Sequence, residues 1–346
     1  MKSLRVLGWL AAGVLLAFVP ACGQQGPSRP KVAFVSNNPE TFWTIAEKGC
    51  AKGEKEFGVE VLFRKPDSGD ASRQTEIIDN LINQDIKALA VSVINPKGQN
   101  EHLKSIAARI PLITQDNDAP YSGRLCYIGT DNYKAGRAVG QLVKEVLPDG
   151  GTLAIFVGQT EPLNARQRRQ GMLDELAGKP QPEDINEIDY GPDGEMYGKY
   201  RLHRTYTDQP IGSQKATENA ADALTQLAEE KNLCFIGLWA YNPPAILSAV
   251  KDKGKLGKVE IVGFDENDAT LQGIADGHIY GTVVQNPFEF GYQAVRIMAA
   301  LAKGDRSVLP RYGTFYVPHR IITKDGGKDR IAATAFQKEL KELLGP

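Results

Sequence analysis

Polar side chains follow six short apolar segments of this 346-residue chain, at the point where each segment ends. With these polar ends the segments read VAFVSNN, LITQDND, LAIFVGQTEPLNAR, FIGLWAYN, IVGFDEND and TVVQN. Carboxylates accept hydrogen bonds, amides both donate and accept, and an Arg guanidinium donates from a fixed plane. Ligands of open parallel α/β sheets bind outside the carboxyl ends of the strands. The pattern therefore predicts one binding cleft assembled from many strand ends.

Motifs for catalysis or for nucleotide binding are missing from these strand ends. The tetrapeptide SNNP follows the first strand in place of a G-x-G-x-x-G fingerprint, and the sequence has neither a P-loop nor a G-x-S-x-G elbow. The four His residues are scattered, with none at metal-ligand spacing. Asp116 with Asp118, and Asp265 with Asp268, could act as acid and base, but no nucleophile or metal ligand accompanies them. We interpret them as hydrogen-bonding groups for a ligand, and predict no enzyme activity, no cofactor and no metal.

Alternating strand and helix patterns must position these polar ends. From Lys31 onward strand-like runs alternate with amphipathic helical segments, which is typical of βαβ units around a parallel sheet. The alternation repeats after about residue 131, and 346 residues are enough for two domains with separate cores. We expect an α/β fold of two tandem doubly wound parallel-sheet domains, with the last elements crossing back between them.

Composition excludes several classes of protein. Charged residues make up 24% of the chain and hydrophobic residues 42%, with a formal net charge of -1, which is typical of a soluble globular protein. No basic arm or run of Lys and Arg is present, so a nucleic-acid partner is not expected.

The first residues have the pattern of an export signal. Lys2 and Arg5 precede an apolar stretch over residues 6–19 that is short for a membrane span. The end of this stretch resembles the lipobox of bacterial lipoproteins, with Ala21 before an acylated Cys22. Ordinary cleavage after Ala21 is the alternative. We expect a signal peptide at 1–21, a lipid-anchor linker at 22–30, and a mature protein on the periplasmic side of a bacterial membrane.

Three further cysteines do not form a disulfide framework. Cys50 falls in a helical stretch, and Cys126 and Cys234 fall in strand-like runs, with no His or second Cys at metal-ligand spacing. We expect buried, unpaired thiols, and a single bridge remains an alternative.

One stretch, residues 179–202, breaks the alternation. It is rich in Gly, Pro and charge, and reads as an exposed insertion with a possible hairpin through residues 191–194. Its aromatic residues Tyr190, Tyr197 and Tyr200 suggest an alternative role as a lip over the cleft or a docking loop.

From about Lys31 to the C-terminal region the chain resembles a periplasmic sugar-binding protein of the ribose/galactose-binding class, the exported component of an ABC importer. The segments that carry the resemblance are NNPETFWTIAEKG, YIGTDNYKAGRAVG, NARQRRQGM, AYNPPAI, IVGFDEND and VVQNP. The resemblance implies two lobes that are joined by a hinge of three strands and close on a ligand. The expected lobes are residues 31–130 with 286–314, and residues 131–285 with 315–346.

The resemblance also implies which residues bind the ligand. A pyranose has apolar faces and a ring of hydroxyls, so it needs aromatic surfaces and polar groups around its edge. Phe42 and Trp43 match the stacking pair. The expected polar ligands are Asn37 or Asn38, Asp116, Asn117, Arg166, Asn242, Asp265 and Gln285.

Several residues near these strand ends bear on specificity or have other expected roles. Asn117 stands where ribose binders carry Arg, which argues against ribose as the ligand. We expect Arg168 and Arg169 to face solvent or to pair with acidic side chains. Trp239 and Tyr241 could be a second stacking surface or could pack in the core or rim.

The implied function is capture of a small carbohydrate or polyol by a monomer that delivers it to an ABC permease. A sensory protein that presents its closed form to a membrane chemoreceptor or sensor kinase would use the same residues. A LacI-type regulator would carry an N-terminal helix-turn-helix where this chain has an export signal. A hydrolase or dehydrogenase is the least favoured alternative.

Overall fold

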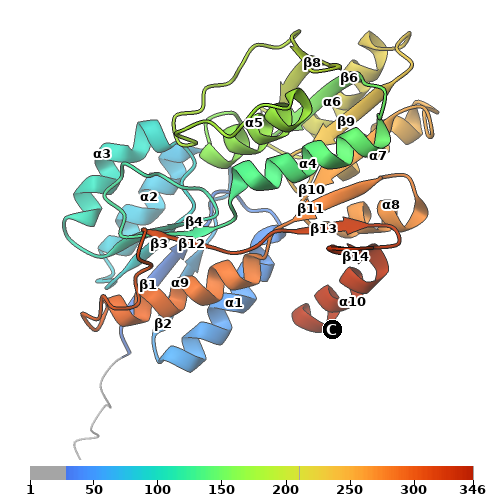
Figure 1. Ribbon diagram of the computed structural model, residues 1–346. Helices are drawn as coiled ribbons and strands as arrows, with labels where there is room; N and C mark the ends of the chain where they lie inside the picture. Colours follow the sequence, from blue (N-terminus) through green and yellow to red (C-terminus); the bar gives the residue numbers. More distant parts are fainter. Residues whose placement is uncertain (1–28, 210, 346) are drawn as a thin grey trace, which may run out of the picture.

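Two β-sheets, each covered by helices on both faces, form two lobes in the computed structural model (Figure 1). The structure describes residues 29–209 and 211–345. The expected signal peptide at 1–21 and the expected lipid site at Cys22 lie outside these residues. None of the helices in the described part of the chain is long and apolar enough to cross a membrane.

The first lobe is built on a six-stranded sheet in the order β12-β5-β4-β3-β1-β2, in which all pairs are parallel. Its strands are β1 (Lys31–Val35), β2 (Glu60–Arg64), β3 (Leu89–Val91), β4 (Leu112–Gln115), β5 (Tyr127–Gly129) and β12 (Thr314–Tyr316). Its helices are α1 (Phe42–Phe57), α2 (Ala71–Ile82), α3 (Pro96–Ala107) and α9 (Pro287–Leu301). Because β1 lies between β2 and β3, the strand order reverses beside β1, and such a switch point is where open sheets bind ligands.

The second lobe has an eight-stranded sheet in the order β14-β13-β11-β10-β9-β6-β8-β7. Its strands are β6 (Gly151–Val157), β7 (Met196–Tyr197), β8 (Tyr200–Thr207), β9 (Leu233–Gly237), β10 (Glu260–Phe264), β11 (Gly281–Val284), β13 (Arg320–Thr323) and β14 (Arg330–Ala332). Its helices are α4 (Asn132–Val146), α5 (Leu163–Ala177), α6 (Ser213–Gln226), α7 (Asn242–Asp252), α8 (Asp268–Asp276) and α10 (Ala333–Leu344). The sheet is parallel except for the β11·β13 and β7·β8 pairs.

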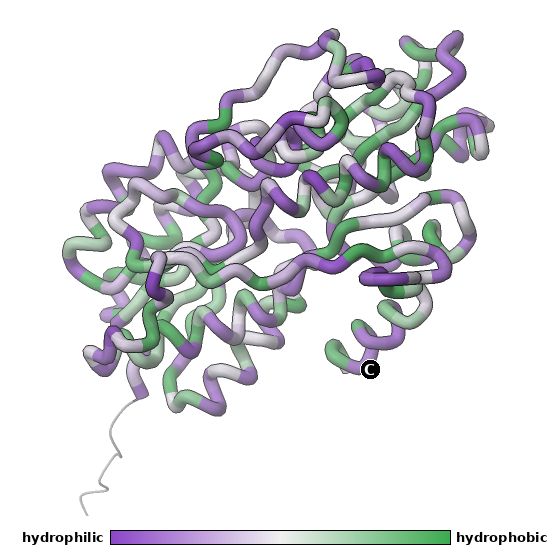
Figure 2. The backbone as a smooth tube through the Cα atoms, viewed as in Figure 1, coloured by the Kyte–Doolittle hydropathy of each residue, from purple (hydrophilic) through white to green (hydrophobic). Residues whose placement is uncertain are grey.

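Each central strand is apolar on both sides because helices cover both faces of its sheet. In β1, Val32 and Phe34 pack into the core that contains α1 and α9, whereas Ala33 and Val35 pack into the core of α2 and α3. β6 divides in the same way between the side of α4 and α5 and the side of α6, α7, α8 and α10. In Figure 2 apolar colour is concentrated along the strands in the interior of each lobe.

The chain passes between the lobes three times, which agrees with the expected three-segment hinge. The crossings follow β5, β11 and β12, at residues 130–131, 285–286 and 317–319. β12 pairs with β5 through Tyr316, so the third crossing lies beyond the expected boundary at residue 314. Strands β13 and β14, which follow it, were not predicted.

The 179–202 insertion is held against α5. Arg166, Gln167 and Arg169 each donate a side-chain hydrogen bond to a backbone carbonyl of this segment. Its hairpin turn lies at residues 198–199, between β7 and β8, and not at residues 191–194 as the Gly and Pro content suggested. Gly198 has a φ of 62°, a left-handed conformation that glycine adopts without steric penalty.

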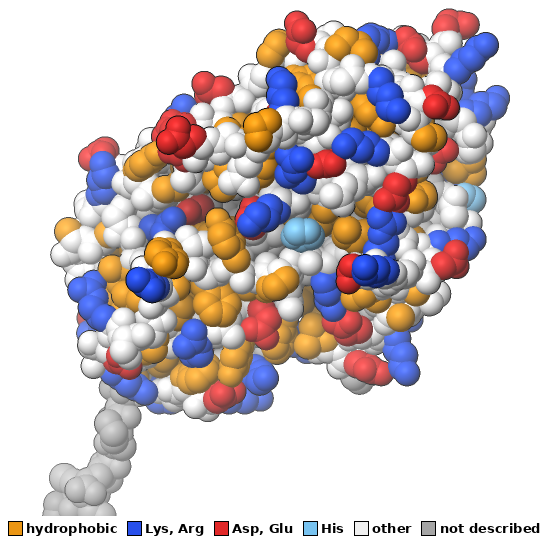
Figure 3. Space-filling view, in the orientation of Figure 1, with side chains coloured by type: hydrophobic (Ala, Val, Ile, Leu, Met, Phe, Trp, Pro, Cys, Tyr) orange, Lys and Arg blue, Asp and Glu red, His pale blue; other side chains and the backbone are white. Residues whose placement is uncertain are grey.

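The three cysteines of the described residues, Cys50, Cys126 and Cys234, are buried and unpaired. The prediction of unpaired thiols is therefore confirmed for them. On the surface, Figure 3 shows Lys and Arg side chains intermixed with Asp and Glu side chains over both lobes of the visible face.

Candidate ligand-binding site

A cavity lies between the lobes, at the carboxyl ends of the strands. It has an empty volume of about 360 Å³, including space open to solvent. The first lobe lines it with Asn37, Asn38, Glu40, Phe42, Trp43 and Asp116. The second lobe contributes Asn164, Arg168, Trp239, Ala240, Tyr241 and Asp265, and Gln285 lines it from a crossing segment.

Two aspartates occupy corresponding places in the two lobes. Asp116 follows β4 and Asp265 follows β10, each the strand two places from the central β1 or β6 in its sheet. Both have left-handed backbones, with φ of 57° and 65°. This conformation is uncommon for residues other than glycine, and strain of this kind concentrates at functional sites. In both lobes, the chain therefore turns at the aspartate that follows the strand, at the edge of the sheet where the cavity lies.

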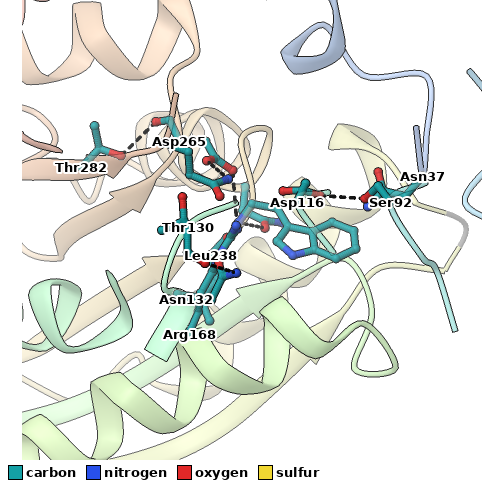
Figure 4. Close-up of polar contacts among 12 residues, drawn as sticks. Asn37, Ser92, Asp116, Thr130, Asn132, Arg168, Leu238, Asp265 and Thr282 are labelled. Atoms are coloured by element: carbon teal, nitrogen blue, oxygen red, sulfur yellow. Dashed lines mark hydrogen bonds and ion pairs between the residues drawn. The ribbon is translucent and has the colours of Figure 1, made fainter. Parts of the chain in front are cut away.

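Each aspartate has a fixed partner in its own lobe. The Ser92 hydroxyl donates to Oδ2 of Asp116 at 2.9 Å (Figure 4). The Gln285 amide donates to Oδ1 of Asp265 at 2.8 Å. Only one oxygen of each carboxylate is used in these two bonds.

Arg168 is the cation of the cavity wall, although its side chain is only 1% exposed. Its Nε donates to Asn132 Oδ1 at 2.9 Å and its Nη1 to the Leu238 carbonyl at 3.0 Å (Figure 4). Nη1 also lies 3.6 Å from Oδ2 of Asp265, and the guanidinium stacks 3.9 Å from the centroid of the Phe264 ring. Nη2 has no hydrogen-bond partner. The guanidinium is thus held rigidly with one donor left for a ligand.

Burial has the largest effect on the pKa values of the two aspartates. Loss of solvent raises the pKa of Asp116 to about 6, against the opposing charge of Arg168 and the Ser92 hydrogen bond. Burial also raises the pKa of Asp265, and Arg168 and Gln285 oppose this shift. Arg168 of the second lobe and Asp116 of the first line the same cavity, and the charge of Arg168 favours the ionised form of Asp116.

Aromatic rings form part of both walls. Phe42 and Trp43 meet edge to face at 5.1 Å between centroids, and the Trp43 indole donates to the side-chain oxygens of Asn37 and Asn38 at 3.1 Å each. These bonds use the amide oxygens and leave the amide N–H groups of both residues for a ligand.

On the opposite wall, Trp239 and Tyr241 meet edge to face at 6.3 Å. Gly158, just after β6, makes room for them, since a Cβ there would lie 2.0 Å from a Trp239 ring carbon and 2.7 Å from the Tyr241 hydroxyl oxygen. The indole N–H of Trp239 is buried without a hydrogen-bond partner among the described residues, whereas the Tyr241 hydroxyl interacts with the Asp208 carboxylate. Both rings offer an apolar surface, and Trp239 also offers a polar atom.

The structure brings together most of the residues expected from the sequence. Those that line the cavity are Asn37, Asn38, Phe42, Trp43, Asp116, Asp265 and Gln285. Three expected residues do not line it: Asn117, Arg166 and Asn242.

These three side chains have other surroundings. Asn117 is fully buried and follows the left-handed turn at Asp116, and its side chain does not line the cavity. Arg166 donates from Nη1 to the Ile188 carbonyl of the insertion at 3.2 Å. Asn242 accepts from the Trp239 backbone N–H at 3.0 Å and donates to Asp208 at 3.0 Å, so it holds the loop that carries Trp239 and Tyr241.

Sequence reasoning missed Glu40, Asn164 and Arg168 as lining residues. Of the two expectations for Arg168 and Arg169, exposure to solvent is wrong and pairing with acids is confirmed, since Arg168 lies 3.6 Å from Asp265 and Arg169 lies 3.4 Å from Asp193. Helix geometry was an available signal, because a residue turns 100° from its predecessor in an α-helix. Asn164 and Arg168 are four residues apart and share a face of α5, whereas Arg166 points roughly to the opposite side. Asp118, in contrast, forms an ion pair with Arg124 at 2.5 Å away from the cavity wall.

The fold and this cavity define a two-lobed binding protein, and the chain belongs to the periplasmic binding protein family. A family model described as a periplasmic binding protein domain matches residues 32–306. The chain is 23% identical over 306 residues to the fructose import binding protein of Bifidobacterium longum, covering 84% of this chain and 87% of the relative. It is also 23% identical over 288 residues to the D-allose-binding periplasmic protein of Escherichia coli, covering 79% and 83%.

Solved structures have the same fold. A solute-binding protein of an ABC transporter from Burkholderia graminis, in complex with D-arabinose, is 25% identical with a TM-score of 0.75, covering 86% of this chain and 96% of that one. A carbohydrate transporter solute-binding protein from Agrobacterium radiobacter is 20% identical with a TM-score of 0.77, covering 92% and 100%. The predicted two-lobed α/β fold and the resemblance to sugar-binding proteins are confirmed.

Proposed function

We propose that this protein captures a small carbohydrate or polyol between its lobes and delivers it, as an exported substrate-binding protein, to an ABC permease. The single observation that carries the proposal is a set of four buried polar atoms, on residues of the cavity wall, that have no hydrogen-bond partner among the described residues. The set is Asn164 Oδ1, Arg168 Nη2, Trp239 Nε1 and Gln285 Oε1.

These atoms favour a hydroxyl-rich ligand. A buried polar group without a hydrogen bond costs about 1–3 kcal/mol, so a ligand that completes these bonds is bound favourably. The set includes donors and acceptors, and a hydroxyl group can act as both. The rings of Phe42, Trp239 and Tyr241 supply surfaces for the apolar faces of a sugar.

The free energies of the available hydrogen bonds are large enough for sub-millimolar affinity. Hydrogen bonds to charged groups contribute about 1.5–3 kcal/mol each, and micromolar affinity requires about 8 kcal/mol in total. The cavity offers two aspartates, one Arg and several amides, so we expect sub-millimolar affinity. The names of the relatives, which include fructose-, allose- and ribose-binding proteins, support a sugar as the ligand class.

Export, a lipid anchor at Cys22 and a monomeric state belong to the same proposal. A permease partner is supported by relatives whose names describe import binding proteins. The alternative of ordinary cleavage after Ala21 would give a free periplasmic protein. Mass spectrometry of the mature N-terminus distinguishes the two.

Calorimetric titration against a panel of pentoses, hexoses and polyols tests the ligand class. We expect saturable binding of at least one member at sub-millimolar concentration, and loss of that binding in Asp265→Ala with the fold retained. A response to amino acids or nucleosides alone would contradict the proposal. Retained affinity in Asp265→Ala would remove that residue from the site.

A further inference from the structure

Charge is unequally distributed over the cavity wall. Three carboxylates line it, those of Glu40, Asp116 and Asp265, whereas Arg168 is the one cationic side chain among the described lining residues. The wall thus carries more acidic than basic groups, and this excess requires a partner when the cleft is closed.

Arg168 lies nearest to the carboxylate of the second lobe, although its charge also favours the ionised form of Asp116. It lies 3.6 Å from Asp265, and its other bonds go to Asn132 and the Leu238 carbonyl. The carboxylate of Asp116, which is 3% exposed, is bonded to the neutral Ser92 hydroxyl. No ion pair reaches Asp116 or Glu40 from the described residues.

Glu40 comes from the loop between β1 and α1. Its backbone N–H donates to the Asn38 side chain at 3.0 Å, which fixes the turn that brings Glu40 to the cavity. Burial raises the pKa of Glu40. Burial and the Asp208 carboxylate raise the pKa of Tyr241 in the second lobe, and Glu40 adds a smaller contribution. The first lobe therefore contributes two carboxylates to the cavity that Trp239 and Tyr241 line from the second lobe.

The free energy of such an arrangement depends on what fills the cavity. A buried carboxylate without a countercharge is unfavourable, and a neutral hydroxyl supplies a hydrogen bond but no compensating charge. An ammonium group supplies both, and indole and phenol rings stabilise a cation over their faces. The cavity has these rings in Trp239 and Tyr241 beside the excess carboxylates.

We infer that the ligand carries a protonated amine together with its hydroxyls, as in an amino sugar or amino polyol. The amine lies against Glu40 and Asp116 of the first lobe. Arg168, Asn164 and Gln285, which line the cavity and each have a buried polar atom without a partner among the described residues, bond the hydroxyl groups. This inference rests on the proposed function and specifies the substrate class of the same site.

Calorimetry with three matched series tests the inference: glucosamine, galactosamine and mannosamine, each beside its parent sugar and its N-acetyl derivative. We expect at least one amine to bind tenfold or more tightly than its parent sugar and its N-acetyl derivative, in which the charge is removed. Neutral sugars that bind as tightly as the amines would overturn the inference and leave the proposed function standing. No binding of any amine or neutral sugar would overturn both.

Two variants then locate the amine. Glu40→Gln and Asp116→Asn keep the size of each side chain and remove its charge, so we expect each to weaken amine binding about tenfold more than it weakens binding of the parent sugar. Glu47→Gln is the control, since Glu47 is an exposed carboxylate of α1 outside the cavity. Unchanged amine affinity in both cavity variants, with normal thermal unfolding, would overturn the assignment.

Discussion

At the scale of single residues, the cavity is defined by buried polar groups whose bonds within the protein are incomplete. Arg168 illustrates this, because Asn132, Leu238 and Asp265 fix its guanidinium while Nη2 is left without a partner. The Arg168 side chain is already ordered in the folded protein, so little of its conformational entropy is lost when a ligand binds.

Two of the three arginines of α5, Arg168 and Arg166, provide a matched test of this role. Arg168→Lys removes the fixed planar donor from the cavity, so we expect affinity for the identified ligand to fall at least about tenfold, or 1.4 kcal/mol. Arg166→Lys is the control and should leave affinity within about twofold, since Arg166 bonds the insertion. Calorimetry and thermal unfolding of both variants separate binding from stability. Equal losses of affinity would contradict the assignment of Arg168.

The pKa of Asp116 predicts how the stability of the unliganded protein depends on pH. A carboxyl group whose native pKa of about 6 exceeds its unfolded value binds more protons in the native state. Its contribution to the free energy of unfolding therefore falls as pH rises from about 4 to about 6, by about 3 kcal/mol at most, and stays low above that.

Asp116→Asn should remove this part of the pH dependence. We expect the variant to be more stable than the parent at pH 7.5 and to lose that advantage at pH 4.5. Arg168 and Asp265 also interact with Asp116. The test therefore compares the free energy of unfolding of Asp116→Asn with that of the parent protein at each pH. Urea unfolding at both pH values measures the difference. A difference that does not change with pH would contradict the raised pKa.

At the scale of elements, the loop between β9 and α7 is held by one buried carboxylate. Asp208 accepts from Asn242 at 3.0 Å and from Asn219 at 2.9 Å. Asn242 also caps the Trp239 backbone N–H, whereas Asn219 bonds only the segment around Thr207 and Asp208. The position of the Trp239 ring therefore depends on Asn242, which does not itself line the cavity.

Asn242→Ala and Asn219→Ala separate stability from positioning. Each removes one donor from Asp208, so we expect each to lower the free energy of unfolding by about 1–3 kcal/mol. Only Asn242→Ala should also weaken ligand binding, because it releases the Trp239 loop. Urea unfolding and calorimetry give the two quantities. Unchanged ligand affinity in Asn242→Ala would show that the loop is held by other contacts.

At the scale of the whole molecule, the lobes meet outside the cavity as well as around it. Gln159 of the second lobe donates to the Gly69 carbonyl of the first at 3.1 Å. A Cβ at Gly69 would lie 2.1 Å from the Cδ1 atom of Ile211, so the closed arrangement depends on the small size of Gly69. The three crossing segments allow the lobes to separate as a hinge.

Gly69→Val should weaken binding without touching the cavity. Its side chain opposes closure, and a binding-competent state that is less populated lowers apparent affinity in proportion, which we expect to be about tenfold. Ile211→Ala in the same chain makes space and should recover most of the loss. Calorimetry and small-angle X-ray scattering with ligand follow affinity and closure together. A Gly69→Val variant with the parent's affinity would show that this contact does not limit closure.

The sequence determined the repeated βαβ pattern, the two lobes and the polar strand ends. These features are local: an apolar run of period two predicts a strand, and the residue after it lies at the edge of the sheet. Asp116, Asp265 and Asn37 could be predicted for that reason. The short strands β13 and β14 could not, because their pairing depends on partners distant in the chain.

Only the tertiary structure decided which side chains face the cavity. Asn117 and Asn242 are adjacent to the site in sequence, but neither lines the cavity: Asn117 follows the left-handed turn at Asp116, and Asn242 is bonded to Asp208 and Trp239. Arg168 lines it because contacts with Asn132, Leu238 and Phe264 of the second lobe bury its guanidinium, whereas Glu40 is only half-buried in the loop after β1. A charged residue reads as exposed in a sequence. The burial of Arg168 depends on partners distant in the chain, which local patterns do not encode.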